Sequence, residues 1–338
     1  MKISKLPFSF YAFLFLSIVI LACSKSGNSD NPGTNTNIYF GFNTKGSLNT
    51  SDQVVQTDAF LDEMSSGLRK NLIIRVTGGT LSQTTYPNDW TSQMIEQWVQ
   101  LQQKHNFKMI YVVNGNDSPT SQYGFIQKWI DHGAKFEFLE MLNETYLPKY
   151  LSGDTHNHPE VTEAITPEQY VDAILPKFWK ELDKFHLPYY VCLARKNPIS
   201  PPQQASIENW NKVVISAIKG KYLFRTLNVT LHLYTTAENQ NFDYNQINEI
   251  RALLPAGIHI AITEAGVIDD SLSSEALGKL AVSHYERIFQ HLQPGDYLLD
   301  QILYNSYPKD NTANLSSVYG ITNKGQQILK FIQSGFRY

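Results

Sequence analysis

Short apolar runs rich in β-branched and aromatic residues alternate along the chain with longer segments in which apolar residues recur at helical spacing. Eight runs of the first kind begin from residue 38 onward: Ile38–Asn43, Leu72–Thr77, Lys108–Val113, Phe136–Leu142, Tyr189–Ala194, Leu227–Tyr234, Ile258–Thr263 and Tyr297–Tyr304. The helical segments between and after them are Asp52–Arg69, Thr91–His105, Gly124–His132, Pro167–Phe185, Ala205–Lys219, Tyr244–Leu254, Ser274–Leu292 and Lys324–Ile332. The apolar runs are continuous rather than alternating, which predicts strands covered on both faces.

Strands that alternate with helices predict parallel βαβ units. Eight such units occupy the chain from Ile38 onward, which predicts an α/β fold with one (β/α)8 TIM barrel over residues 38–338. An open doubly wound sheet is the alternative. Nucleotide chemistry on such a sheet is disfavoured, because the first run leads into Thr44-Lys45-Gly46 rather than G-x-G-x-x-G, and no G-x-x-x-x-G-K-[ST] occurs.

The first 37 residues are predicted to form a targeting signal and a flexible tether rather than part of the barrel. Lys2 and Lys5 precede an apolar run of about 8–22, which is typical of a signal peptide and short for a membrane-spanning helix. The run ends Ala22-Cys23 and resembles a bacterial lipobox, which implies a signal peptide over 1–22 and lipidation of Cys23. Residues 23–37 read as a flexible tether. The expected location is the bacterial cell envelope, lipid-anchored on the periplasmic side or the cell surface.

Composition narrows the function. The charge balance is 28 basic against 31 acidic residues, a net of −3, which rules out a strong electrostatic case for nucleic-acid binding. Two cysteines cannot form a disulfide framework, and Cys192 lies in an apolar run, as a buried structural thiol would. No cofactor is predicted, and the oligomeric state is left open.

Candidate chemistry is sought where strands end, because barrel enzymes carry their active residues at the carboxyl ends of strands. The fourth run ends in Asn143-Glu144 and the seventh run is followed by Glu264. Two carboxylates facing one barrel mouth are what glycosidic bond cleavage requires, one as acid/base and one as nucleophile or activator of water.

The placement of these residues resembles the retaining glycoside hydrolases of clan A. Arg75 lies on the second run in an Arg-x-x-Gly-Gly context, and His232-Leu233-Tyr234 ends the sixth. Tyr319-Gly320-Ile321 is similar to a stretch that follows the last strand in many members. Two departures stand out: Leu142 occupies a position where many members have a small residue, and Tyr304 lies where the clan usually has tryptophan.

This resemblance implies a retaining β-glycoside hydrolase that acts on a poly- or oligosaccharide through a covalent glycosyl-enzyme. Glu144 would be the acid/base, with a raised pKa, and Glu264 the nucleophile, their carboxyl groups ~5–5.5 Å apart. Asn143 would bind the sugar 2-hydroxyl, while Arg75 and Tyr234 would keep Glu264 ionised.

Several of these residues also have ordinary structural interpretations. Arg75 could pair with Glu140, His232 and Tyr234 could be interior residues, Glu144 could be a solvated loop residue, and Glu264 could support a turn. Tyr86, Trp90 and Tyr304 are expected near the mouth, with Trp90 and Tyr304 as sugar-contacting residues or as packing.

Two other functions stay open at this point. One is a non-catalytic glycan-binding lipoprotein on a degenerate barrel. The other is a hydrolase or lyase that uses Glu144 with a metal held by the His156/His158 loop, although no third ligand is evident and no metal site is predicted.

Overall fold

The computed structural model describes residues 38–45, 51–78, 81–84, 91–147, 165–196, 201–239, 242–269, 271–300, 315–317 and 320–335. Residues 37–338 form one compact unit. The predicted signal peptide, Cys23 and the tether lie outside the described residues, so these stay predictions. None of the helices in the described ranges combines the length and the hydropathy that crossing a membrane requires.

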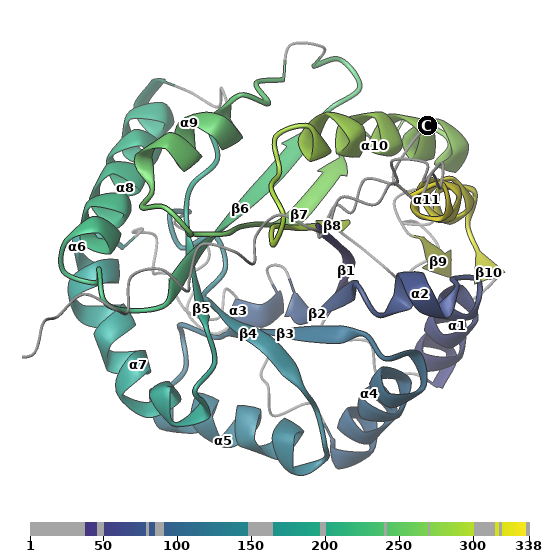
Figure 1. Cartoon of the computed structure of the whole chain (residues 1–338), viewed down its shortest axis with the longest axis horizontal. Coiled ribbons are helices and arrows are strands. Elements are labelled where there is room, and N and C mark those ends of the chain that lie inside the picture. The colour runs from purple at the N-terminus through teal and green to yellow at the C-terminus, as the bar shows by residue number, and fades with distance from the viewer. Residues whose placement is uncertain are drawn as a thin grey trace, which may run out of the picture. The chain divides into compact units, whose positions relative to one another are not determined.

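Eight parallel strands close into a barrel in the order β1-β2-β3-β4-β5-β6-β7-β8 (Figure 1). They are β1 Tyr39–Lys45, β2 Leu72–Gly78, β3 Lys108–Val113, β4 Phe136–Met141, β5 Tyr189–Cys192, β6 Leu227–Thr235, β7 Ile260–Val267 and β8 Tyr297–Asp300. The predicted (β/α)8 barrel is confirmed. A small two-stranded sheet of β9 Ser316–Ser317 and β10 Gly320–Ile321 lies outside it.

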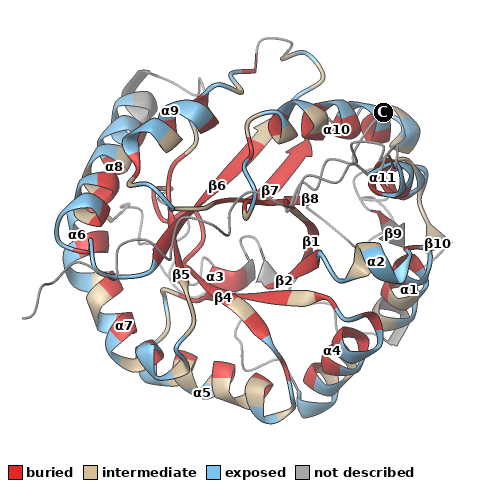
Figure 2. Cartoon of the chain, in the orientation of Figure 1, coloured by how far each residue is buried: buried red, intermediate tan, exposed pale blue. Residues whose placement is uncertain are grey.

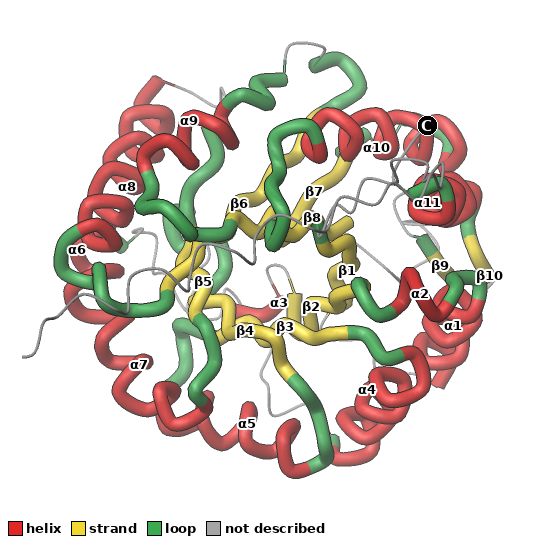
Figure 3. Tube along the Cα trace, viewed as in Figure 1, coloured by secondary structure: helices red, strands yellow, loops and turns green. Residues whose placement is uncertain are grey.

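Helices surround the strands (Figure 3). They are α1 Ser51–Asp62, α2 Ser66–Arg69, α3 Leu81–Thr84, α4 Ser92–His105, α5 Pro119–Asp131, α6 Pro167–Gln169, α7 Leu175–Leu182, α8 Pro201–Lys219, α9 Gln246–Leu253, α10 Ser274–Phe289 and α11 Asn323–Gln333, with a π turn η3 Tyr170–Ile174 and a 3₁₀ turn η4 Asp183–Phe185 flanking α7.

Local sequence explains where these helices differ from the predicted segments. Ser65 caps α2 by accepting a hydrogen bond from the Leu68 N–H, which divides the predicted 52–69 helix in two. Ser118 caps α5 and Pro119 takes its first position, so this helix begins five residues before Gly124. The π turn ends two residues before Pro176, which has no N–H to continue the regular pattern.

The apolar interior has two parts. The larger part fills the space between strands and helices, and buried faces turn inward all round the barrel while exposed faces turn outward (Figure 2). The smaller part lies inside the barrel and consists of Ile73, Ile110, Phe138, Tyr190, Ala261, Tyr297 and Leu299. Its centre is a stack of Phe138 on Tyr190, with ring centroids 3.7 Å apart. We call these seven residues the apolar layer.

Candidate active site

Arg75 is the centre of a charged group directly above the apolar layer, two residues along β2 from Ile73. Its side chain has no solvent exposure. Nε and Nη2 donate to Glu140 at 2.6 and 2.8 Å, Nη1 donates to Glu264 at 2.6 Å and Asn43 at 2.8 Å, and Nη2 also donates to Asn143 at 2.7 Å. All five guanidinium N–H groups are therefore satisfied, as a buried cation requires.

Glu264 lies within β7 rather than after it, because the strand continues to Val267 beyond the predicted end at Thr263. One carboxylate oxygen accepts from Arg75, and the other accepts a short hydrogen bond from the Tyr234 hydroxyl. The preceding Thr263 also faces the interior, since its hydroxyl donates to Glu140 at 3.2 Å. Arg75 thus binds the carboxylates of both Glu140 and Glu264. Its interpretation as a structural partner of Glu140 and its interpretation as a support for Glu264 are therefore compatible.

Two consecutive inward residues are unusual, because neighbours along a regular strand face opposite sides. The register explains them. Leu231 on β6 pairs with Ile262, but the next residue, His232, pairs with Glu264, so Thr263 is an extra residue on β7. A bulge of this kind re-aims side chains, and it turns Glu264 into the barrel opposite His232.

Glu144 reaches the same space from the turn that follows β4. Leu142 and Glu144 both have left-handed backbone, with φ of 70° and 45°. This conformation is costly for residues other than glycine, and Leu142 offsets it with a fully buried side chain. The Glu144 carboxylate is buried and accepts from the Tyr146 hydroxyl at 3.3 Å.

His232 lies between the carboxylates. Its Nδ1 is 3.1 Å from Glu144 Oε1 and 3.7 Å from Glu264 Oε2, and its Nε2 is 3.9 Å from Glu140. The contact at 3.1 Å does not have the angle of a hydrogen bond and the other two are too long for one, so neither ring nitrogen has a hydrogen-bond partner among the described residues. Because two oxygens approach the same Nδ1, the distances of 3.1 and 3.7 Å limit their separation to about 6.8 Å.

These contacts determine the protonation of the group. Burial alone would lower the pKa of His232, but the charges of Glu264 and Glu144 and its contacts with Glu140 and Glu144 raise it to about 9. Burial would raise the pKa of Glu144, but His232, Arg195 and Tyr146 lower it to about 2. The predicted raised pKa of Glu144 is therefore wrong for the free protein, in which an imidazolium faces an ionised Glu144.

Sequence reasoning missed Arg195, which follows β5, and treated Glu140 only as a partner for Arg75. The Arg195 guanidinium lies over the Tyr234 ring, 5.6 Å from its centroid, and its charge lowers the pKa of Glu144. The rule used for Glu144 could have found Arg195, because it is the first charged residue after the fifth apolar run. Glu140 could have been found by counting two residues onward from Phe138, because side chains two apart on a strand face the same side.

Buried donors without partners gather at this end of the barrel. Within the described residues, Nδ2 of Asn143, Nε of Arg195 and both ring nitrogens of His232 have no hydrogen-bond partner. Buried polar atoms are rarely left unpaired unless a ligand or water pairs with them. Trp90, Tyr304, Tyr86 and the His156/His158 loop lie outside the described residues, so their roles stay predictions.

Cys192 on β5 is the buried thiol that was predicted, with 3% of its surface exposed. Burial raises the pKa of this thiol, which keeps it protonated and unreactive.

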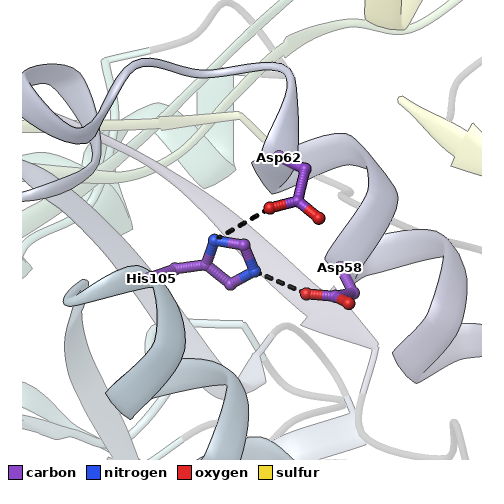
Figure 4. A group of neighbouring side chains, drawn as sticks. All are labelled: Asp58, Asp62 and His105. Carbon is purple, nitrogen blue, oxygen red and sulfur yellow. Dashed lines mark hydrogen bonds and ion pairs between the residues drawn. The ribbon is translucent and has the colours of Figure 1, made fainter.

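A second group of chemically interesting side chains lies on the outer layer (Figure 4). His105 at the end of α4 contacts Asp58 at 2.6 Å and Asp62 at 3.9 Å, both on α1. Metal ligands can be arranged in this way. Here the Lys104 ammonium already binds both aspartates, and Arg69 contacts His105 and Asp62, so two cations balance two carboxylates. The group is an ion-pair network that joins α1, α2 and α4.

No protein-family model matches the sequence, and no curated protein matches it either. The fold is similar to solved structures of glycoside hydrolases. A family 39 glycoside hydrolase from the gut symbiont Bacteroides cellulosilyticus WH2 gives a TM-score of 0.51 at 12% identity, covering 87% of this chain and 63% of that one. The intracellular xylanase TsXylA from Thermoanaerobacterium saccharolyticum gives 0.50 at 9% identity, covering 89% and 99%.

The exo-β-1,4-mannosidase Op5Man5 from Opitutaceae bacterium strain TAV5 gives a TM-score of 0.50 at 10% identity, covering 88% of this chain and 60% of that one. The chain spans 63% of the length of the family 39 enzyme. Likeness at this level of identity establishes the fold: a single-domain barrel of the kind that these glycoside hydrolases have. What such a barrel does in this chain has to be argued from its own residues.

Proposed function

We propose that the protein is a retaining β-glycoside hydrolase that cleaves a poly- or oligosaccharide and is held in the bacterial cell envelope by a lipid on Cys23. The observation that carries the catalytic proposal is the arrangement of Glu144 and Glu264 on either side of His232. Retaining enzymes have their carboxyl groups ~5–5.5 Å apart and inverting enzymes ~6.5–9.5 Å apart. The facing oxygens lie at most about 6.8 Å apart, which excludes most of the inverting range and is compatible with retention.

In this mechanism Glu264 is the nucleophile. Arg75 and Tyr234 hold its two oxygens in fixed positions, which orients the carboxylate toward the anomeric carbon. Its attack forms a glycosyl ester while the bond to the leaving oxygen breaks. Asn143, whose Nδ2 is free of protein partners in the described residues, would donate to the sugar 2-hydroxyl, a contact that strengthens in the transition state.

The proton for the leaving oxygen is stored on His232 rather than on Glu144. It would move across the 3.1 Å contact from Nδ1 to Glu144 and from there to the leaving oxygen. Ester formation removes the negative charge of Glu264, which lowers the pKa of His232 and leaves it neutral. Glu144, now ionised, takes a proton from the attacking water in the second step, and that proton returns to His232 when Glu264 is regenerated.

Two variants test this assignment. Glu264→Ala should remove turnover of an aryl glycoside while the protein remains folded, and Glu144→Gln should lower it by about 10²–10⁴-fold. Glu137→Gln is the matched control. Glu137 lies on β4, the strand that leads to Glu144, but it is near the amino end of that strand, where it binds Lys108 away from the candidate active site. A 2-fluoro glycoside should leave a covalent sugar on the peptide that contains Glu264. Wild-type activity in Glu264→Ala would end the proposal.

A non-catalytic glycan-binding lipoprotein is the second candidate. The ionised state of Glu144 favours it, since a resting general acid would be protonated. It predicts measurable glycan affinity with no hydrolysis of any panel glycan, and an affinity that changes little in Glu264→Ala.

A further inference from the structure

Three large apolar side chains stand in solvent at one corner of the molecule. Leu223 is 52% exposed, Phe224 100% and Leu253 54%, and they are half of the strongly exposed large apolar residues in the described ranges. Leu223 and Phe224 lie between α8 and β6, and Leu253 ends α9. The two loops share a cavity of about 240 Å³ that Leu223, Pro255 and other residues of both loops line. We call Leu223, Phe224 and Leu253 the apolar corner.

The apolar corner lies at the amino end of the barrel, opposite the candidate active site, because both loops lead into the first residues of strands. The chain enters β1 at this same end, where the Tyr39 N–H donates to the carbonyl of Asp296 just before β8. Between Cys23 and Ile38 lie residues 24–37, which can span at most about 50 Å when extended.

Charge does not explain the exposure of this corner. Lys221 pairs with Asp172 and Arg225 pairs with Asp183, so the basic residues beside Phe224 are already balanced. Exposed apolar side chains on two loops that line one hollow, with Leu223 itself in the lining, point to a surface that meets another apolar surface.

We propose that the apolar corner inserts into the bilayer interface and holds the barrel with its candidate active site facing away from the membrane. The inference rests on the proposed lipid on Cys23. The partner that we assign to the apolar corner is the lipid bilayer that this anchor would enter. A short tether raises the effective concentration of the corner at the membrane to the mM range, so a weak contact is sufficient. An apolar face of this kind settles near the headgroup boundary.

The test compares two positions of equal exposure at opposite ends of the barrel. Leu223 and Ile268, the first residue after β7, are each 52% exposed. Leu223→Cys and Ile268→Cys full chains, purified in detergent and labelled with a nitrobenzoxadiazole fluorophore, are reconstituted into phosphatidylethanolamine and phosphatidylglycerol vesicles. Cys192 is buried and does not react, and an acylated Cys23 would not react either, so labelling of the unsubstituted chain reports the lipid anchor.

The expected result is a blue-shifted emission at position 223 that nitroxide-labelled lipids quench, with an emission typical of water at position 268. Equal, water-like emission at both positions overturns the proposal, and so does a blue shift at 223 that lipids do not quench, which would indicate a second copy on the corner. If the chain does not float with vesicles, the anchor and the corner both fail, whereas floating without quenching leaves the anchor intact. A Leu223→Ser/Phe224→Ser chain should hydrolyse a soluble glycoside as before.

Discussion

The interior of the barrel consists of two layers built on the same strands. In the apolar layer, residues such as Ile73 and Phe138 pack against rings and methyl groups. Two residues further along β2 and β4, Arg75 and Glu140 occupy the same faces and begin a layer held by ion pairs. The apolar layer is held mainly by packing of rings and aliphatic side chains, while the charged layer depends on each partner being present and correctly protonated.

The charged layer is tightly balanced. Three carboxylates, Glu140, Glu144 and Glu264, face the two cations Arg75 and His232, with Arg195 nearby. Removing one partner from such a group leaves a buried charge without compensation, which costs more than the pair contributes. Loss of an apolar residue leaves a cavity but disturbs no charge. The two layers should therefore respond differently to substitution and to pH.

The largest effects are expected from one substitution in each layer, which should cost similar stability but differ in activity. Phe138→Ala should lower the free energy of unfolding by about 3–5 kcal/mol through a cavity, and Arg75→Met by a similar about 3–5 kcal/mol through unpaired carboxylates. Activity per folded molecule should persist in Phe138→Ala and vanish in Arg75→Met. Urea unfolding followed by fluorescence, with turnover measured on the folded fraction, checks both. An Arg75→Met protein as stable as wild type would show that the charged layer is not coupled in this way.

The next effect is a pH dependence that the apolar layer lacks. The pKa of His232 is raised to about 9, so its protonation stabilises the fold fully below its unfolded pKa near 6.5 and this contribution disappears as the pH rises through about 9. The loss should be on the order of 1–3 kcal/mol. Unfolding free energies measured at pH 6, 7.5 and 9.5 should converge for wild type and His232→Gln as the pH rises. A constant difference across this range would contradict the prediction.

A smaller effect should appear where β4 leaves the barrel. Leu142 has a φ of 70°, whereas the adjacent Met141, equally buried, belongs to the strand. Both residues lose packing on truncation, but Leu142→Gly should be more stable than Leu142→Ala by about 1 kcal/mol, because glycine adopts this backbone without strain. At Met141 the order should reverse, and thermal unfolding of the four variants compares them. The same order at both positions would exclude strain at Leu142.

The smallest effect is expected on the outer layer. Lys104→Ala removes an exposed cation from Asp58 and Asp62, where solvent and Arg69 can take over, so the urea midpoint should stay within error of wild type. EDTA should also leave the melting temperature unchanged. A clear drop with EDTA, restored by Zn²⁺, would show that His105 and the two aspartates hold a metal.

The fold was predictable because parallel barrel strands are buried on both faces, and continuous apolar runs such as Lys108–Val113 express this directly. Helix starts depended on single capping residues, and Ser118 was overlooked. At the site, the rule that polar residues follow strands located Glu144 and Glu264, and the resemblance to clan A located Arg75 and His232. Their roles in catalysis stay predictions.

Other features of the site could not be read from the sequence. The ionised state of Glu144 depends on a contact with His232, from a strand almost ninety residues away, and on Arg195. The extension of β7 through Glu264 depends on how it pairs with β6. Both are tertiary properties that local periodicity does not contain.

The extra residue on β7 has a consequence for engineering. Copying the identities of Arg75, His232 and Glu264 onto the matching positions of a regular barrel would not transplant the site, because without the irregularity at Thr263 a carboxylate at position 264 would point toward the helices. A designer would need to transfer the insertion itself. Deleting Thr263 should not undo the site in the same way, because Glu264 would then directly follow Ile262, stay in register with His232 and still face inward, while the contact of the Thr263 hydroxyl with Glu140 would be lost.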